Sequence, residues 1–140
     1  MFRLDRLLQW RTLEREREEG RLQALHSELE RLSAARRALE RNAELAEQSV
    51  RRPGVLIEER QALDGYRRFM ASERQRLLRL RAELEIRIEK QRQALVEAER
   101  KVEALSRMRD DKKAEWRAEL DKEQEELVSE LVVARWGRRA

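Results

Sequence analysis

The 140-residue sequence has no cysteine, a single proline, four glycines and few aromatic residues. Without cysteine it can form neither a disulfide framework nor a thiolate metal site, which suits a reducing compartment such as the cytoplasm. Its longest uninterrupted apolar run covers only residues 131–134, whereas a bilayer span needs about 20 residues. The opening "MFRLDRLLQW" also lacks the apolar region and cleavage site of a signal peptide. We therefore predict a cytoplasmic chain without a membrane-inserted segment.

Charge is what the sequence has in abundance, at 44% of its residues. Together with many Leu and Ala residues, this composition is typical of long helices and coiled coils, and the apolar residues are too periodic for a disordered chain. The net charge is +4, and the basic excess lies in residues 51–109, which hold 16 basic and 10 acidic residues. Because Glu and Arg alternate closely there, we interpret them as helix-face pairs, and we expect no nucleic-acid partner.

Two apolar seams with heptad spacing predict two long helices. The first seam has one vacancy, a heptad position at Arg36 without an apolar residue, and it predicts helix one over about residues 2–51. The stretch "RTLEREREEGR" before this seam has no apolar seam of its own and should be the loosest part of that helix. The second seam starts at Leu63 and predicts helix two over about residues 65–136. The first seam consists of residues 22, 25, 29, 32, 39, 43, 46 and 50.

The stretch "SVRRPGVLIEE", residues 49–59, separates the two predicted helices. Pro53 lacks a backbone donor and disfavours a helical Arg52, while Gly54 tolerates a positive φ. We predict a turn and a short helical segment over about residues 52–64, with a second weak break at Asp64 and Gly65. No linker composition indicates a second domain, so residues 1–140 are predicted to form a single coiled-coil domain.

The early position of this break makes the predicted helices unequal. A short connection makes two helices neighbours that fold back on each other, and at 1.5 Å per residue these would be about 75 Å and about 110 Å long. The predicted fold is therefore all-α, with two long helices forming an antiparallel coiled-coil hairpin of unequal arms. A C-terminal helical overhang of about 25 to 30 residues should remain.

The predicted overhang carries apolar side chains that have no partner within the chain. Unpaired apolar stripes on a helix usually mark a binding surface, and Trp is the side chain most enriched at interface hot spots. We favour a different protein as the partner; self-association of two overhangs and a frayed end remain open alternatives. The residues concerned are Trp116, Leu120, Leu127, Leu131, Val132, Val133 and Trp136.

Catalytic chemistry has little support in the sequence. The single histidine, His26, lies beside the seam where an exposed residue is expected, and adjacent acids such as Glu58 and Glu59 point about 100° apart on a helix. No phosphate-binding loop, zinc motif or nucleophile elbow occurs. We predict a protein that is not an enzyme, with no catalytic residues, no metal site and no cofactor.

Three stretches of the sequence resemble the flagellar export protein FliJ family. They are "FRLDRLLQWRTLEREREE" near the N-terminus, "LDGYRRFMASERQRL" from residue 63, and "VEALSRMRDDKKAEWRAELDKEQEELVSEL" near the C-terminus. The resemblance extends over nearly the whole chain and includes its length and early break. It implies a cytoplasmic stalk and chaperone escort of the flagellar type III export apparatus, a system of protein transport, flagellum biogenesis and motility.

The resemblance also implies partners and contact residues. The partners would be the hexameric export ATPase, an export-gate membrane protein and export chaperones, so the chain would associate peripherally with the membrane apparatus. Tyr66, Phe69 and Met70 match the region that contacts the gate. The chain ends match the part that contacts the ATPase ring or another protein, which here comprises Leu4, Leu8, Trp116, Leu127, Leu131 and Trp136.

One departure and several alternatives accompany this resemblance. Glu73 stands where the family has an apolar residue, one helical turn after Phe69. A stalk protein of virulence type III secretion, a generic scaffold that dimerises through its overhang, and a nucleic-acid binder using the basic residues between Arg67 and Arg92 are the other functions that the sequence allows.

Overall fold

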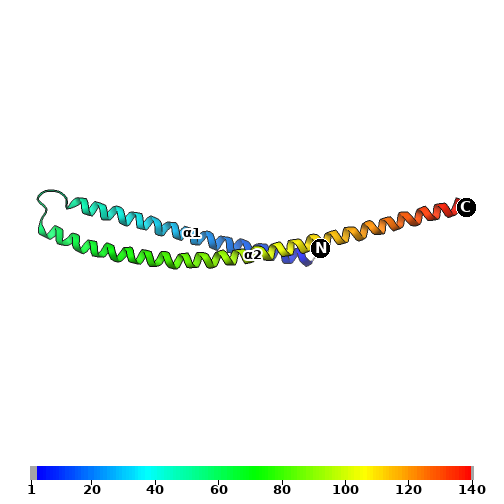
Figure 1. Ribbon diagram of the computed structural model, residues 1–140, viewed down its shortest axis with the longest axis horizontal. Coiled ribbons are helices and arrows are strands. Elements are labelled where there is room, and N and C mark those ends of the chain that lie inside the picture. Colours follow the sequence, from blue (N-terminus) through cyan, green and yellow to red (C-terminus); the bar gives the residue numbers. More distant parts are fainter. Residues whose placement is uncertain (1–2, 140) are drawn as a thin grey trace. The chain divides into compact units, whose positions relative to one another are not determined.

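The computed structural model describes residues 3–139, which are helical except for one short connection. Helix α1 spans Arg3–Ser49 and helix α2 spans Ile57–Arg139, with 47 and 83 residues respectively. Figure 1 shows the two helices and the connection between them. The described residues contain no strand, which confirms the predicted all-α class and its two long helices. Residue 2, the start of the predicted first helix, lies outside the described residues.

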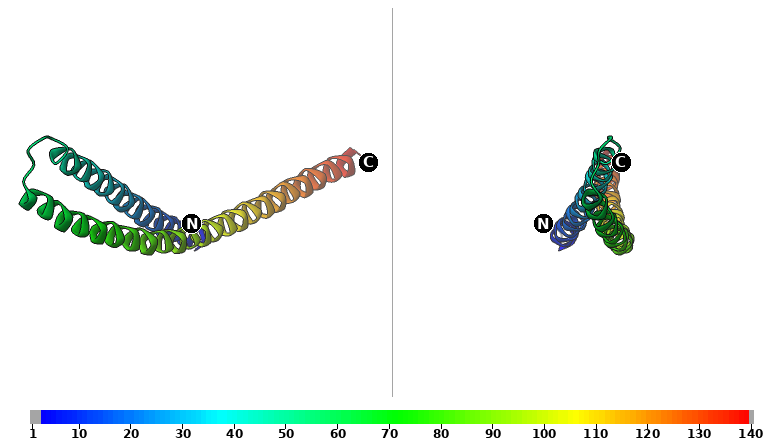
Figure 2. Two further views of the ribbon diagram at one scale, coloured as in Figure 1. Left: turned by 60° about the vertical axis from the view of Figure 1, so that its left-hand side comes forward. Right: turned by 90° about the vertical axis from the view of Figure 1, so that its left-hand side faces the viewer.

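The connection between α1 and α2 falls where Pro53 and Gly54 predicted it (Figures 1 and 2). Gly54 has a φ of 81°, and it is the one glycine of the described residues with a positive φ. The Ser49 hydroxyl donates a hydrogen bond to the carbonyl of Ala46 at 2.7 Å, at the point where α1 ends. Across the connection, Arg52 pairs with Glu59 in the first turn of α2 at 3.0 Å. The break is thus a turn stabilised by polar contacts on both sides.

Helix α2 begins at Ile57, not near residue 65 as predicted from the sequence. The separate helical segment and the second break at Asp64 and Gly65 are therefore wrong, because both residues lie inside one continuous helix. The physical reason is that a glycine costs a helix only about 1 kcal/mol, whereas Leu63 and Met70 are both buried and anchor the helix on either side of it. Packing outweighs the local helix propensity here.

Substitution of two glycines by alanine should have opposite effects on stability. Gly65→Ala is expected to raise the free energy of unfolding by about 0.8 to 1 kcal/mol, because Ala is the better helix former and nothing lies within 4 Å of the new Cβ. Gly54→Ala is expected to lower it by about 1 to 2 kcal/mol, because its φ of 81° is strained for any residue with a Cβ. Urea denaturation measures both changes; equal effects of the two variants would contradict the assignment of Gly54 as the turn residue.

The described residues form two compact parts. We call residues 16–96 the central part, and residues 3–15 together with residues 97–139 the terminal part. In the central part, α1 and α2 pack against each other (Figure 1). Ion pairs join Glu47 to Arg67 at 2.6 Å, Glu40 to Arg74 at 2.7 Å and Glu28 to Arg87 at 3.9 Å. From one pair to the next, the residue number falls in α1 and rises in α2 by nearly equal steps. One register of the two helices therefore accounts for all three pairs.

The interior of the central part is a narrow apolar seam. Its main cluster consists of Leu25 from α1 with Leu84 and Ile88 from α2, and three further leucines of α1 pack against it. Each residue of the predicted first seam is buried or half-buried, whereas Arg36 at the vacancy is exposed. The heptad spacing therefore identified the packed face of α1 correctly. The three flanking leucines are Leu22, Leu29 and Leu32.

A polar contact interrupts the seam near the start of the central part. The Gln91 side-chain amide donates hydrogen bonds to the backbone carbonyl of Glu18, at 3.0 Å, and to its carboxylate. Two residues further along α1, Gly20 is exposed and nothing lies within 4 Å of where its Cβ would be. This stretch, which lacks apolar seam residues, is thus joined to α2 through hydrogen bonds. Its predicted looseness stays a prediction.

The terminal part has its own packed residues. Leu4 and Leu8 of α1 are half-buried, as are Val102 and Leu105 of α2, while Ala98 is buried. Beyond Lys113 the pattern changes, because every side chain from residue 114 to residue 138 is exposed. The packed portion of α2 therefore ends about two helical turns before Leu120.

Candidate partner-binding surfaces

Residues 114–138 of α2, which we call the C-terminal surface, hold most of the exposed large apolar side chains of the terminal part. Trp116 is 55% exposed, Leu127 58%, Leu131 68% and Trp136 75%. Isolated exposed apolar residues are ordinary, but eight of them along one stretch of helix form a large apolar surface. The other four are Leu120, Val128, Val132 and Val133.

These side chains do not all share one face of the helix. At about 100° per residue, Trp116, Leu120, Leu127 and Leu131 lie within a sector of roughly 60°. We call these four residues the apolar row. By the same geometry Trp136 lies roughly opposite Trp116, so the predicted set of contact residues divides between two faces. Toward its end the helix is apolar around most of its circumference, which is typical of a helix enclosed by other protein.

The N-terminal contact residues predicted from the sequence are only partly available. Leu4 and Leu8 are half-buried, whereas Leu7, Trp10 and Leu13 are exposed. The Arg11 guanidinium lies 4.7 Å from the centre of the Trp10 ring, close enough for a cation–π contact. Sequence analysis missed this outer face because it followed only the heptad seam; the i, i+3, i+6 spacing of the three exposed residues was the available signal.

The three predicted gate-contact residues differ in how exposed their side chains are. The rings of Tyr66 and Phe69 stack with centroids 6.4 Å apart and planes inclined by 28°. Phe69 is 57% exposed and available to a partner, whereas Met70 is only 3% exposed. Met70 belongs to the seam, because residues 63, 70 and 77 recur every seven positions and all three are buried. The assignment of Met70 as a contact residue is therefore wrong in this structure.

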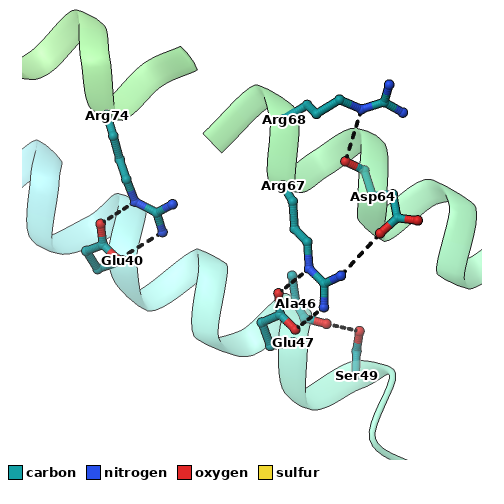
Figure 3. Close-up of polar contacts among 8 residues, drawn as sticks. All are labelled: Glu40, Ala46, Glu47, Ser49, Asp64, Arg67, Arg68 and Arg74. Atoms are coloured by element: carbon teal, nitrogen blue, oxygen red, sulfur yellow. Dashed lines mark hydrogen bonds and ion pairs between the residues drawn. The ribbon is translucent and has the colours of Figure 1, made fainter. Parts of the chain in front are cut away.

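Two arginines of the segment that follows Tyr66 are paired with carboxylates of α1, as Figure 3 shows for Arg67 and Arg74. Arg67 donates two hydrogen bonds to the Glu47 carboxylate, from Nε at 2.6 Å and from Nη2 at 2.7 Å, and its Nη1 bonds Asp64 at 3.2 Å. Arg74 makes the same two-pronged contact with Glu40, at 2.7 and 3.1 Å. Basic residues committed to carboxylates are poor phosphate ligands, so this geometry does not favour a nucleic-acid site.

The residue that departs from the family pattern also has a partner within α2. Glu73 is half-buried and pairs with Arg76 at 3.0 Å, one helical turn further along. Such pairs on an exposed helix face are common and individually weak. Glu73 thus offers a paired carboxylate at the position where the family has an apolar side chain.

The two paired carboxylates make the central part sensitive to acid. The hydrogen bonds from Arg74 lower the pKa of Glu40, and those from Arg67 lower the pKa of Glu47. A carboxyl group whose pKa is lower in the folded state stabilises the fold above its unfolded pKa, about 4.3 for Glu, and this contribution is lost as the pH falls through the folded value. The melting temperature should therefore decrease as the pH is lowered below about 4.5. Thermal unfolding followed by circular dichroism between pH 7 and pH 3 measures this loss.

The control is the double variant Arg67→Gln and Arg74→Gln, which removes both partners of the carboxylates. Its melting temperature should be lower than that of the parent chain at pH 7 and should depend less on pH below about 4.5. Equal pH dependence of the parent and the variant would show that other carboxylates cause the acid sensitivity.

A shallow groove lies between α1 and α2 in the central part. Its apolar floor consists of Leu32, Ala35, Leu77, Leu80 and Leu84, and Glu and Arg side chains form its rim.

Within residues 3–138, no group of three His, Asp or Glu residues is arranged to hold a metal ion. No helix of the described chain is long and apolar enough to cross a membrane.

These features define a class: an all-helical protein of two long helices, with a narrow seam and exposed apolar helix surfaces. Comparisons add no narrower assignment, since no family model, no curated protein and no solved structure matches this chain. The function must therefore be inferred from the surfaces themselves.

Proposed function

We propose that the chain is a coiled-coil stalk of the flagellar type III export apparatus. In this role it binds the hexameric export ATPase, links it to the export gate and escorts export chaperones. The resemblance of three sequence stretches to the FliJ family supports the proposal, together with a helical build that suits a connector better than a catalyst. A concave pocket in which a substrate could be enclosed is a usual requirement of an enzyme, and a seam between two helices offers only grooves.

We further infer that the chain is an antiparallel hairpin of unequal arms with a C-terminal overhang. The opposite order of the ion pairs along α1 and α2 supports the antiparallel arrangement. The lengths of 47 and 83 residues support the unequal arms, and the uniform exposure of residues 114–138 supports the overhang. A packed seam between two helices resists bending, which suits a protein that connects two partners.

The C-terminal surface is the single observation on which the proposal mainly depends. Toward the end of this surface the apolar side chains lie around most of the helix circumference, and a helix of that kind is usually enclosed by other protein. The central opening of a ring surrounds a helix on all sides, whereas a flat docking surface covers one face. We therefore assign Leu127, Leu131 and Trp136 to the contact with the ATPase ring.

The second contact uses the aromatic pair of the central part. Tyr66 and Phe69 stack on each other in the turn of α2 that also carries Arg67, which pairs with Glu47 and Asp64, and the buried Met70. Phe69 offers an exposed ring to an export-gate protein, and association with that protein would bring the chain to the membrane apparatus. Since Glu73 replaces the apolar neighbour, this contact relies mainly on Phe69.

Measurement of ATP hydrolysis tests the proposal. The export ATPase alone is compared with the ATPase after addition of the purified chain, at concentrations where the hexamer forms. We expect an increase in the rate that saturates, because a helix in the central opening favours the assembled ring. If the rate is unchanged and the two proteins do not associate, the stalk function is wrong.

A further inference from the structure

A row of glutamates runs along the C-terminal surface beside the apolar row. Glu119, Glu123, Glu126 and Glu130 follow one another at steps of four, three and four residues. At about 100° per residue they lie within a sector of roughly 60°, centred about 80° from the centre of the apolar row. The two rows are therefore adjacent and parallel along about three turns of α2. We call these four residues the glutamate row.

The glutamate row differs from the acidic residues of the central part. There, glutamates are commonly paired with arginines, as in the contacts of Glu40 and Glu47. Among the side chains that the structure describes, none of the four row carboxylates forms an ion pair, and all four are exposed. Like charges at i, i+3 and i+4 on a helix repel each other and weaken the helix. The row thus lowers the stability of the free helix, and a basic counter-surface would remove that repulsion.

Charge selects among the surfaces that could cover the apolar row. Residues 114–130 contain seven acidic and two basic residues. Phosphates of nucleic acids and of anionic lipids would be repelled by this segment. The occupant of the apolar row is therefore expected to be a protein surface with positive charge.

A second copy of this chain fits the row poorly. In an antiparallel pair of helices, the flank of one helix faces the same flank of its partner, so the two glutamate rows would meet. In a parallel pair, the row would face the opposite flank, where Arg117, Asp121, Val128 and Arg135 lie. That flank offers two bases and one acid to four carboxylates.

We propose that the C-terminal surface binds a protein surface with an apolar groove and a row of Lys or Arg along one rim of that groove. The apolar row occupies the groove, and the glutamate row forms ion pairs with the basic rim. Because the glutamates lie on one side only, they also fix the rotation of the helix in its site. The inference rests on the proposed role of this surface in partner binding and specifies the chemistry of the partner.

A titration with two designed helical peptides tests this inference on the full-length chain. Both peptides carry a leucine row; one has an arginine row beside it and the other a glutamate row at the same positions. Replacing Trp10 and Trp136 by Phe leaves Trp116 as the fluorescent reporter. We expect the arginine peptide to bind at least tenfold more tightly than the glutamate peptide, with an affinity that falls as salt is raised. Equal binding of the two peptides, or binding of neither, would overturn the inference.

Two variants with the same change of net charge show whether the row itself is responsible. In the row variant, Glu119, Glu123, Glu126 and Glu130 become Gln. In the matched control, four exposed glutamates elsewhere on α2 become Gln, namely Glu85, Glu89, Glu97 and Glu99. The row variant should bind the arginine peptide at least tenfold more weakly, whereas the control should retain its affinity. If both variants lose affinity for the arginine peptide equally, net charge alone explains the effect and the inference is overturned.

The folding of the row variant provides an independent measurement. Since it removes four like charges from one face, its helix content by circular dichroism should equal or exceed that of the parent chain. A loss of helix would contradict the repulsion on which the inference depends.

The export ATPase separates this inference from the proposed function. If the ATPase binds the row variant as tightly as the parent chain, the stalk function stands and the basic rim is wrong. If the ATPase does not bind the parent chain but the arginine peptide binds through the row, the inference stands and the stalk function is wrong.

Discussion

Replacing Leu127, Leu131 and Trp136 together by alanine is expected to weaken binding to the export ATPase at least 100-fold. Each of these side chains is more than half exposed in the free chain, and full burial of a large apolar side chain is worth about 1.5 to 3 kcal/mol. Since 1.4 kcal/mol changes an equilibrium constant tenfold, two such losses already exceed 100-fold. Isothermal titration calorimetry with the assembled ATPase measures the change.

The control for this variant uses exposed apolar residues of the central part. Leu45, Leu78 and Ile86 are exposed as well, and none of them belongs to the C-terminal surface. Their joint replacement by alanine should leave the affinity unchanged within about twofold, and alanine preserves helix propensity in both variants. Equal weakening by the two triple variants would mean that apolar exposure in general, and not the C-terminal surface, determines binding.

Leu84→Ala is expected to lower the free energy of unfolding of the central part by about 2 to 5 kcal/mol. Leu84 is only 3% exposed and packs in the cluster with Leu25 and Ile88, so truncation loses apolar burial and leaves a cavity. A seam of this kind has few buried residues, and each accounts for a large share of the stability. Urea denaturation followed by circular dichroism measures the change.

Ile86→Ala is the matched control for Leu84→Ala. Ile86 lies two residues away on the same helix and is 59% exposed, so its truncation should change the stability by no more than about 0.5 kcal/mol. If the two substitutions destabilise the protein equally, the heptad seam is not the source of its stability.

Much of the fold could be predicted because a coiled coil uses one repeating rule. The seam residues of α1 and the position of the turn at Pro53 and Gly54 both follow from spacing and backbone chemistry. The error at Gly65 arose because local propensity was weighed without packing. Burial of Leu63 and Met70 on either side keeps the helix continuous, and a single sequence does not show how firmly its neighbours will be anchored.

The contact surfaces were harder to predict than the seam. Met70 lies seven residues after Leu63, so its spacing indicated the seam, yet the family resemblance placed it with Phe69 in the gate contact; Met70 is buried and Phe69 is exposed. At the chain ends, the predicted contact residues Leu4 and Leu8 are half-buried, whereas Trp10 is exposed. Which side of an amphipathic helix stays free depends on the helix packed against it. That information lies in the tertiary structure.

The mass of the assembly formed with the export ATPase tests the stalk proposal most directly. A ring has one central opening, so we expect native mass spectrometry of a mixture with excess chain to show six ATPase subunits and one copy of the 16.9 kDa chain. The Leu127, Leu131 and Trp136 variant should leave the bare hexamer. An assembly with six copies of the chain, one for each subunit, would place the chain on the outside of the ring and contradict the account.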